Sequence, residues 1–185
     1  MAGASATTPF VVGVAGWKNS GKTTLVERLV TELARRGYRV STVKHSHHDI
    51  SGEAEGTDSA RHRRAGAHEV ALVSPRRWAV LRGASDLAWQ DEAEPPLAAI
   101  VARLEPPDIV IVEGMKRAPI PKIEVRRSGQ GPGVPLADGD PQVFAVAADC
   151  AVAGGNVPAF SLDDVAGLAA ALLAKAGLPG RRGNS

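Results

Sequence analysis

The segment 10–24, FVVGVAGWKNSGKTT, constrains the possible fold of this chain more than any other. Its apolar beginning, residues 10–14, predicts a buried strand, and a helical pattern follows the loop. Between them lies the G-x-x-x-x-G-K-[ST] pattern of a phosphate-binding loop, carried by Gly16, Gly21, Lys22 and Thr23. The glycines permit backbone torsions at which successive N–H groups converge on one anion, and the helix directs its positive end there.

Each residue type in the loop has an expected task. Backbone N–H groups should hold the α- and β-phosphates of a nucleotide, and the residues concerned are Asn19, Ser20, Gly21, Lys22, Thr23 and Thr24. Gly16 is a further expected nucleotide-binding residue. The Lys22 ammonium should neutralise β/γ charge, and the Thr23 hydroxyl should ligate Mg²⁺. The alternative is a chance glycine-rich turn, and a complete pattern with the correct flanks argues against it.

Composition narrows the class of protein further. The 185 residues suit one domain, and 22 basic against 20 acidic residues make no case for nucleic acid or a membrane surface as a partner. Cys150 is the single cysteine, so no internal disulfide can form. The chain has no apolar run of about 18 residues and begins without the apolar core of a secretion signal, so we expect a cytoplasmic protein.

Alternating strand and helix patterns predict a P-loop NTPase-like α/β fold with a mostly parallel sheet and helices on both faces. We expect a disordered start at 1–8, one nucleotide-binding domain over 9–175 and a flexible tail at 176–185. The expected strands are 10–14, 38–44, 69–74, 78–81, 108–112, 122–126, 142–148 and 158–160. The expected helices are 22–36, 58–67, 96–104 and one after 161, with Ser161 as its cap and Asp164 completing a capping box. Alternation in 122–126 predicts a strand with one solvated face, and 128–141 is too weakly patterned for a helix.

A histidine-rich segment, HSHHD at 45–49, follows the second expected strand, at the sheet edge where ligands bind. A metal site is one interpretation, because imidazoles and Asp49 are competent ligands. The other is that His48 and Asp49 line a nucleotide or partner surface, with Asp49 orienting water. The turn that contains Ser74 and Pro75 also follows a strand and could reach the same edge.

Two carboxylates end other strands. Glu113, followed by Gly114, stands at the tip of the apolar strand 108–112, where P-loop nucleotidases hold Mg²⁺. Asp is the commoner residue there, and Glu113 has a longer reach and a possible base-like role on water. Asp149 follows the strand 142–148 and could accept hydrogen bonds from N1–H and the 2-amino group of guanine. The alternative, that Asp149 merely caps its strand, is supported at least equally well, since the sequence lacks the N-K-x-D tetrad that recognises the guanine base.

Over residues 10–173 the chain resembles the molybdopterin-guanine dinucleotide biosynthesis protein B (MobB) family. The matching motifs are GWKNSGKTTL at the loop, TVKHSHHD at 42–49, DSARHRRAGA at 58–67, VEGMK at 112–116 and PKIEVRR at 121–127. The resemblance implies a homodimeric GTP-binding protein with weak intrinsic GTPase activity. It also implies partnership with a MobA-like molybdopterin guanylyltransferase or with molybdopterin-binding proteins. Gly114 and Lys116 of VEGMK join the expected nucleotide-binding residues.

Lys22, Glu113 and Asp49 are the candidate catalytic residues, with no strong base or arginine finger among them, so we expect slow hydrolysis by an adapter. Two other classes share parts of the pattern. A small-molecule kinase would use the same loop with an arginine-rich lid, for which 61–64 is a candidate. A metallochaperone GTPase would use the histidine-rich segment. Many relatives in the wider class carry a lysine where this chain has Trp17, so the resemblance does not extend to an intersubunit lysine contact.

Overall fold

The computed structural model describes residues 8–45, 69–73, 78–82, 96–129, 134–152 and 157–181. Contacts within the chain divide it into two units, and each is described by itself. The first unit comprises Met1–His45 and Leu104–Ser185, and the second comprises Ser46–Arg103. The phosphate loop and the strand-end carboxylates all belong to the first unit.

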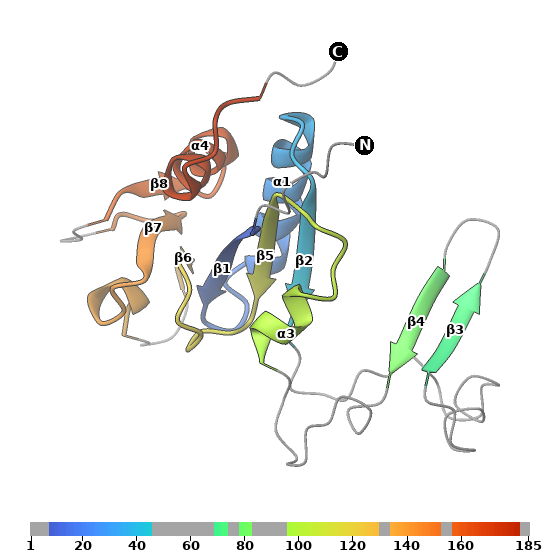
Figure 1. Ribbon diagram of the computed structural model, residues 1–185. Coiled ribbons are helices and arrows are strands. Elements are labelled where there is room, and N and C mark those ends of the chain that lie inside the picture. The colour runs from blue at the N-terminus through green and yellow to red at the C-terminus, as the bar shows by residue number, and fades with distance from the viewer. Residues whose placement is uncertain are drawn as a thin grey trace. The chain divides into compact units, whose positions relative to one another are not determined.

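A six-stranded sheet forms the centre of the first unit (Figure 1). Its strands are β1 (Phe10–Gly16), β2 (Val40–Lys44), β5 (Ile109–Glu113), β6 (Lys122–Arg126), β7 (Val143–Ala148) and β8 (Ala159–Ser161). They lie in the order β2-β5-β1-β6-β7-β8, and every neighbouring pair is parallel. The α/β fold with a parallel sheet that the sequence predicts is therefore confirmed.

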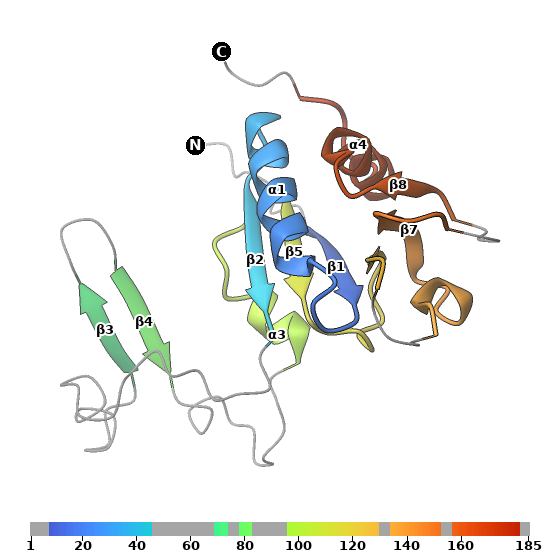
Figure 2. The same cartoon turned by 180° about the vertical axis from the view of Figure 1, so that it is seen from behind.

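Two helices cover the sheet, α1 (Lys22–Arg35) and α4 (Val165–Ala176). They contact each other, α1 packs on β1, β2 and β5, and α4 packs on β7 and β8. Figure 2 shows α1 beside β2 and β5, and α4 beside β8. Apolar residues one turn apart face the sheet in α1, because Leu25, Leu29 and Leu33 are at most 2% exposed. Strand β1, which lies inside the sheet, thus leads into the phosphate loop. Helix α1 follows the loop and buries its apolar side against the sheet.

The expectation of a solvated face on β6 is wrong. Lys122 and Glu124 alternate with core residues, yet each is only 1% exposed. Lys122 Nζ donates to Asp140 Oδ2 at 2.8 Å, and Glu124 accepts hydrogen bonds from the N–H groups of Leu136 and Ala137. Those two residues belong to a short 3₁₀ helix, Leu136–Asp138, in a segment for which no helix is expected. The charged face of β6 is buried because this segment covers it, pairs with Lys122 and donates to Glu124. Arg126 of β6 itself completes the pairing, since its guanidinium donates to Glu124 Oε2 at 2.8 Å.

The cap of the last helix also differs from expectation. Helix α4 begins after Asp164, whose Oδ1 accepts from the Gly167 N–H at 2.9 Å. Ser161 belongs to β8 instead, and its Oγ accepts from the Asp163 N–H. The capping-box pattern places the helix start three residues early, because Asp164 serves as the cap itself.

Beyond α4, part of the expected tail contacts the sheet unit. The Tyr38 hydroxyl donates to the Pro179 carbonyl, and Arg181 forms two hydrogen bonds with the Asp108 carboxylate at 2.9 and 3.0 Å. The Arg181 guanidinium also lies over the Tyr38 ring, 4.9 Å from its centre. Residues 177–181 are therefore anchored at the amino ends of β2 and β5.

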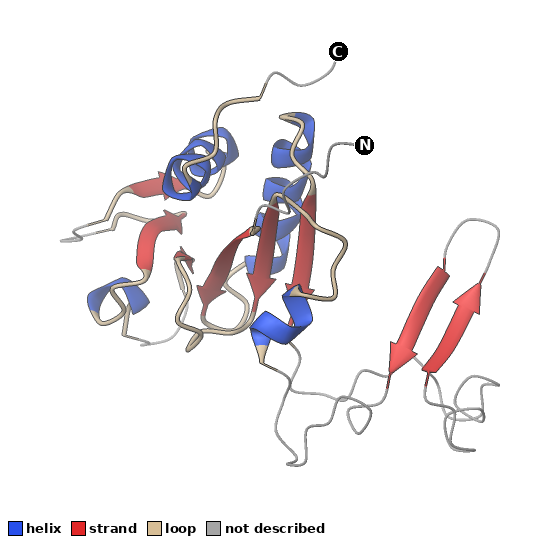
Figure 3. Cartoon of the chain, viewed as in Figure 1, coloured by secondary structure: helices blue, strands red, loops and turns tan. Residues whose placement is uncertain are grey.

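In the second unit, β3 (Glu69–Val73) and β4 (Trp78–Arg82) pair as an antiparallel two-stranded sheet, and α3 spans Leu97–Val101 (Figure 3). Both strands agree with the sequence pattern, and α3 is shorter than the expected helix 96–104. The expected helix 58–67 lies outside the described residues. No helix among the described residues is long and apolar enough to cross a membrane.

Candidate functional site

The candidate site lies at the carboxyl ends of the central strands, where the chain passes from β1 through the loop into α1. Parallel register brings three strand ends together, since Val14 of β1 and Lys44 of β2 both pair with Glu113 of β5. Open α/β sheets bind ligands at such carboxyl ends. The residues that the sequence singles out in β1, β5 and α1 are thereby gathered at one edge.

Backbone conformation in the loop depends on residues that tolerate unusual torsions. Gly21 has φ +86° and Asn19 has φ +63°, both in the left-handed region, and Gly21 precedes α1 without a side-chain cap. Gly16 permits a close approach, because a Cβ there would lie 2.5 Å from the Val125 carbonyl oxygen and 2.8 Å from Ser20 Oγ. The first N–H groups of α1 are thus left available to an anion.

Lys22, the loop lysine, folds back on its own loop. Its Nζ donates to the Trp17 carbonyl at 2.6 Å and lies 3.5 Å from Ser20 Oγ. Burial lowers the pKa of Lys22, as do the nearby ammonium groups of Lys116 and Lys44, while the Glu113 carboxylate opposes this. A polyanion at the loop would favour the charged ammonium and would offer Nζ better acceptors than a carbonyl.

Glu113 is a buried charge of the site, and its carboxylate contacts one side chain of α1 and one of β2. Thr23 Oγ1 donates to Glu113 Oε1 at 2.8 Å, and Lys44 Nζ lies 2.8 Å from the same oxygen. Lys44 Nζ is also 3.4 Å from Thr23 Oγ1. The Glu113 side chain is 11% exposed and that of Lys44 is 61% exposed, so the carboxylate is fixed while its counter-ion reaches in from the surface.

The Thr23 and Glu113 oxygens fit a magnesium ion. Both are hard oxygen donors, and their 2.8 Å separation is close to the edge, about 3.0 Å, of an octahedron with bonds of ~2.1 Å. Mg²⁺ usually keeps several waters and takes only one or two protein ligands beside substrate phosphates. These two residues would hold such an ion beside the phosphate loop.

Trp17 and Lys116 form a second contact at the loop. Lys116 Nζ lies 4.1 Å from the centre of the Trp17 ring, and Trp17 is 40% exposed. Gly114, between the carboxylate and Lys116, has φ +106°, and a Cβ on it would lie 3.0 Å from the His45 carbonyl oxygen. The glycine lets the chain turn away from Glu113 and bring Lys116 back over the loop.

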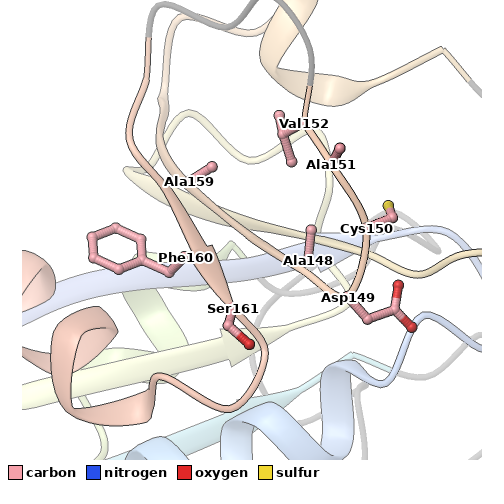
Figure 4. A pocket seen from close by; sticks show the side chains of 8 residues that line it. All are labelled: Ala148, Asp149, Cys150, Ala151, Val152, Ala159, Phe160 and Ser161. Atoms are coloured by element: carbon pink, nitrogen blue, oxygen red, sulfur yellow. The ribbon is translucent and has the colours of Figure 1, made fainter.

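Asp149 ends β7 at a pocket of about 400 Å³ that residues 148–152 and β8 line (Figure 4). Its carboxylate accepts hydrogen bonds from the Ser128 N–H at 2.6 Å and from the Ser128 hydroxyl at 3.2 Å. Arg127 Nε lies 3.6 Å from Asp149 Oδ2. A Cβ built on Gly21 would lie 3.9 Å from Arg127 Cζ, so this guanidinium lies close to both Asp149 and the phosphate loop.

Four expected site residues, His48, Asp49, Ser74 and Pro75, lie outside the described residues. Most of the histidine-rich segment does as well, so the metal-site interpretation stays a prediction. Within the ranges that the structure describes, no group of three or more His, Cys, Asp or Glu side chains could hold a metal ion.

Sequence reasoning missed three residues of this site. Lys44 contacts Glu113, Arg127 lies beside Gly21, and Ser128 donates to Asp149. Each stands at or just after the carboxyl end of a parallel strand, β2 for Lys44 and β6 for the other two. The rule that ligands bind at these ends could have pointed to all three.

The parallel sheet, the loop after β1 and the carboxylate at the tip of β5 define an α/β protein of the P-loop NTPase-like class. The family model described as "MobB: Molybdopterin guanine dinucleotide synthesis protein B" matches residues 11–149. The chain therefore belongs to the MobB family.

Curated relatives and solved structures agree with this assignment. A molybdopterin-guanine dinucleotide biosynthesis adapter protein of Escherichia coli is 35% identical over 161 residues, 86% of this chain and 89% of the relative. Its counterpart in Haemophilus influenzae is 39% identical over 137 residues, 74% and 73% of the two chains. A crystal structure of molybdopterin-guanine biosynthesis protein B has a TM-score of 0.67 at 29% identity and covers 91% of this chain and 99% of its own. A MobB homologue from Bacillus stearothermophilus has a TM-score of 0.60 at 27% identity, with 90% and 97% covered.

Proposed function

We propose that this chain is a GTP-binding adapter protein of molybdopterin guanine dinucleotide synthesis, with weak GTPase activity. The contact between Thr23 Oγ1 and Glu113 Oε1 carries the nucleotide-binding part of the proposal. It joins the end of the phosphate loop to a carboxylate on the neighbouring strand, which is the arrangement that Mg²⁺ and a triphosphate require. Lys22 binds the β- and γ-phosphates, and bound Mg²⁺ supplies charge neutralisation.

The proposed base is guanine, and its proposed place is the pocket beside Asp149. The Asp149 side chain is 33% exposed, and each of its oxygens has acceptor capacity beyond the Ser128 hydrogen bonds. The carboxylate can therefore accept from N1–H and the 2-amino group of guanine. Adenine has no such pair of donors on that edge, so Asp149 favours GTP over ATP.

Slow hydrolysis is expected because the Glu113 carboxylate is already hydrogen-bonded and paired. Its Oε1 already accepts from Thr23 and pairs with Lys44, so the carboxylate is suited to hold a cation rather than to deprotonate water. We expect a turnover well below about 1 s⁻¹ in the absence of a partner. Nucleotide then serves as a signal in an adapter, and membership of the family supports that role.

Family membership also supports the proposed partners. The relatives carry the name of molybdopterin-guanine dinucleotide biosynthesis adapter protein. We infer that this chain contacts a molybdopterin guanylyltransferase of the MobA type, or proteins that carry molybdopterin. It does so as a cytoplasmic homodimer.

Binding of GTP tests the first part of the proposal. Lys22→Ala removes a charge-assisted hydrogen bond of about 1.5–3 kcal/mol, so calorimetry should show Mg²⁺–GTP binding at least about tenfold weaker. The control is Lys175→Ala, which removes the same charge from the last turn of α4, outside the candidate site. Equal affinity for GTP in the two variants would contradict nucleotide binding at this loop.

Base selectivity is tested at Asp149. Asp149→Asn replaces an acceptor by a group that presents a donor to guanine, so the preference for GTP over ATP should fall by about tenfold or more. Competition binding with both nucleotides measures the preference. An unchanged ratio in the variant would place guanine recognition elsewhere.

The adapter role is tested by co-purification with a tagged molybdopterin guanylyltransferase, with and without GTP, followed by analysis of bound pterin. GTP-dependent retention of the wild-type chain and its loss in Lys22→Ala are the expected results. Turnover that requires an added phosphoryl acceptor would favour a small-molecule kinase instead.

A further inference from the structure

Lys44 lies where the proposed cation site needs room. Its ammonium is 2.8 Å from Glu113 Oε1 and 3.4 Å from Thr23 Oγ1, the two oxygens suited to Mg²⁺. A carboxylate as buried as that of Glu113 needs a positive partner when no other cation is present. Lys44 supplies that charge from the adjacent strand.

A divalent cation on the same oxygen conflicts with this arrangement. An ion about 2.1 Å from Oε1 and an ammonium 2.8 Å from Oε1 can be no more than about 5 Å apart, with a single carboxylate between them. The repulsion between them is strong at a partly buried site. One carboxylate therefore cannot hold both cations at full strength.

Lys44 is free to leave. Its side chain is 61% exposed, and it comes from β2, which stands at the edge of the sheet. The backbone around it is held independently of its ammonium, because β2 pairs with β5 and the His45 N–H donates to the Glu113 carbonyl at 2.9 Å. The long side chain can move into solvent while the strand stays in place.

We propose that Lys44 is the resident counter-ion of Glu113, that Mg²⁺ and Lys44 bind this carboxylate in competition, and that Lys44 thereby sets the metal affinity of the site. The inference rests on the proposed function, because it takes Thr23 and Glu113 as the metal-holding pair. It makes Lys44 a residue that tunes the site: it weakens metal binding in the nucleotide-free protein. With nucleotide bound, the released ammonium meets the negative charge of the phosphates.

The test measures binding of Mn²⁺ alone, as a paramagnetic stand-in for Mg²⁺, from the signal of free Mn²⁺ in electron paramagnetic resonance. Lys44→Met removes the competing charge, so the full-length variant should bind Mn²⁺ at least about fivefold more tightly than wild type. Lys175→Met, which makes the same change on α4, should leave the affinity unchanged. The double variant Lys44→Met/Glu113→Gln should lose the gain, which separates this site from metal bound by histidines.

Unchanged or weaker Mn²⁺ binding in folded Lys44→Met would overturn the proposal, as would a gain that persists in the double variant. The proposed function fails differently: Lys22→Ala would then leave GTP binding intact, whatever Lys44 does. If Lys44→Met does not fold, a crystal structure of the wild-type protein with Mg²⁺ and a non-hydrolysable GTP analogue decides. A Lys44 Nζ to Glu113 Oε1 distance beyond about 4 Å is expected, and a retained ion pair would refute competition.

Discussion

Glu113 shows at the scale of single residues how this site combines stability with readiness to bind. Its carboxylate is buried, yet its ion-pair partner Lys44 is largely exposed, so the pair can separate without opening the core. Lys22 is similarly held by a replaceable partner, the Trp17 carbonyl. Both lysines are placed where an incoming cation or polyanion would change their contacts.

Gly16 makes a sharper prediction at this scale. In Gly16→Ala the new Cβ would meet the Val125 carbonyl oxygen at 2.5 Å, and backbone there cannot yield cheaply. We expect the free energy of unfolding to fall by about 1–3 kcal/mol, measured by urea denaturation. Gly139→Ala is the matched control, because nothing lies within 4 Å of its Cβ, and it should change stability by less than about 0.5 kcal/mol. Equal stability of the two variants would show that the loop relaxes around the methyl group.

Strand β6 shows what is decided at the scale of elements. Lys122 and Glu124 alternate with apolar residues as they would in a strand with one side in water, but both are buried. The cover comes from outside the strand: Asp140 pairs with Lys122, and the N–H groups of residues 136 and 137 donate to Glu124. Within the strand, Arg126 also pairs with Glu124. Period-two alternation assigns side chains to faces, and it does not say what covers a face.

The start of α4 carries the prediction for an element. Asp164→Ala removes the acceptor for the Gly167 N–H and should lower the free energy of unfolding by about 1 kcal/mol. Ser161→Ala removes only an exposed contact with the Asp163 N–H and should cost less than about 0.5 kcal/mol. Thermal and urea unfolding of the two variants measure the difference. A larger loss for Ser161→Ala would restore the earlier helix start that the sequence pattern suggests.

For the sheet unit as a whole, residues 177–181 are held against the edge where β2 and β5 begin. Asp108 is central, since it accepts from the Arg39 N–H at 2.8 Å and from Arg181 through both oxygens. Burial alone would raise the pKa of Asp108, but the hydrogen bonds from Arg39 and Arg181 outweigh it and hold that pKa below its usual 3.8. Charge on Asp108 thus ties the end of the chain to the sheet.

Acid titration tests whether the Asp108–Arg181 ion pair stabilises the unit. Because the folded pKa of Asp108 is depressed, its contribution to stability is present above about pH 3.8 and is lost as the pH falls through the folded value. Arg181→Ala should therefore lower the free energy of unfolding by about 0.5–1.5 kcal/mol at pH 7, and the deficit should shrink in strong acid. Urea denaturation across that range measures it. A deficit that is independent of pH would assign the effect to packing on Tyr38 instead of charge.

Local pattern predicted much of the fold. Apolar runs located the strands to within two residues, the spacing of Leu25, Leu29 and Leu33 located α1, and the phosphate-loop pattern located the turn between β1 and α1. These features depend on residues close in sequence, where steric limits and hydrophobic periodicity act directly. For the same reason the sequence predicts that Thr23 and Glu113 hold one cation together, since each lies at a recognisable boundary of an element.

The sequence by itself determined which groups stand at the carboxyl-end edge of the sheet: a phosphate loop and strand ends that carry charge. Its motifs also determined the family to which the chain belongs. Only the tertiary structure decided which charges meet there. Lys44 and Glu113 are 69 positions apart, and parallel pairing of β2 with β5 brings them within 2.8 Å. Neither residue encodes that distance, because strand order arises from burial across the whole sheet. It is this non-local pairing that puts an ammonium where the sequence predicts a magnesium ion.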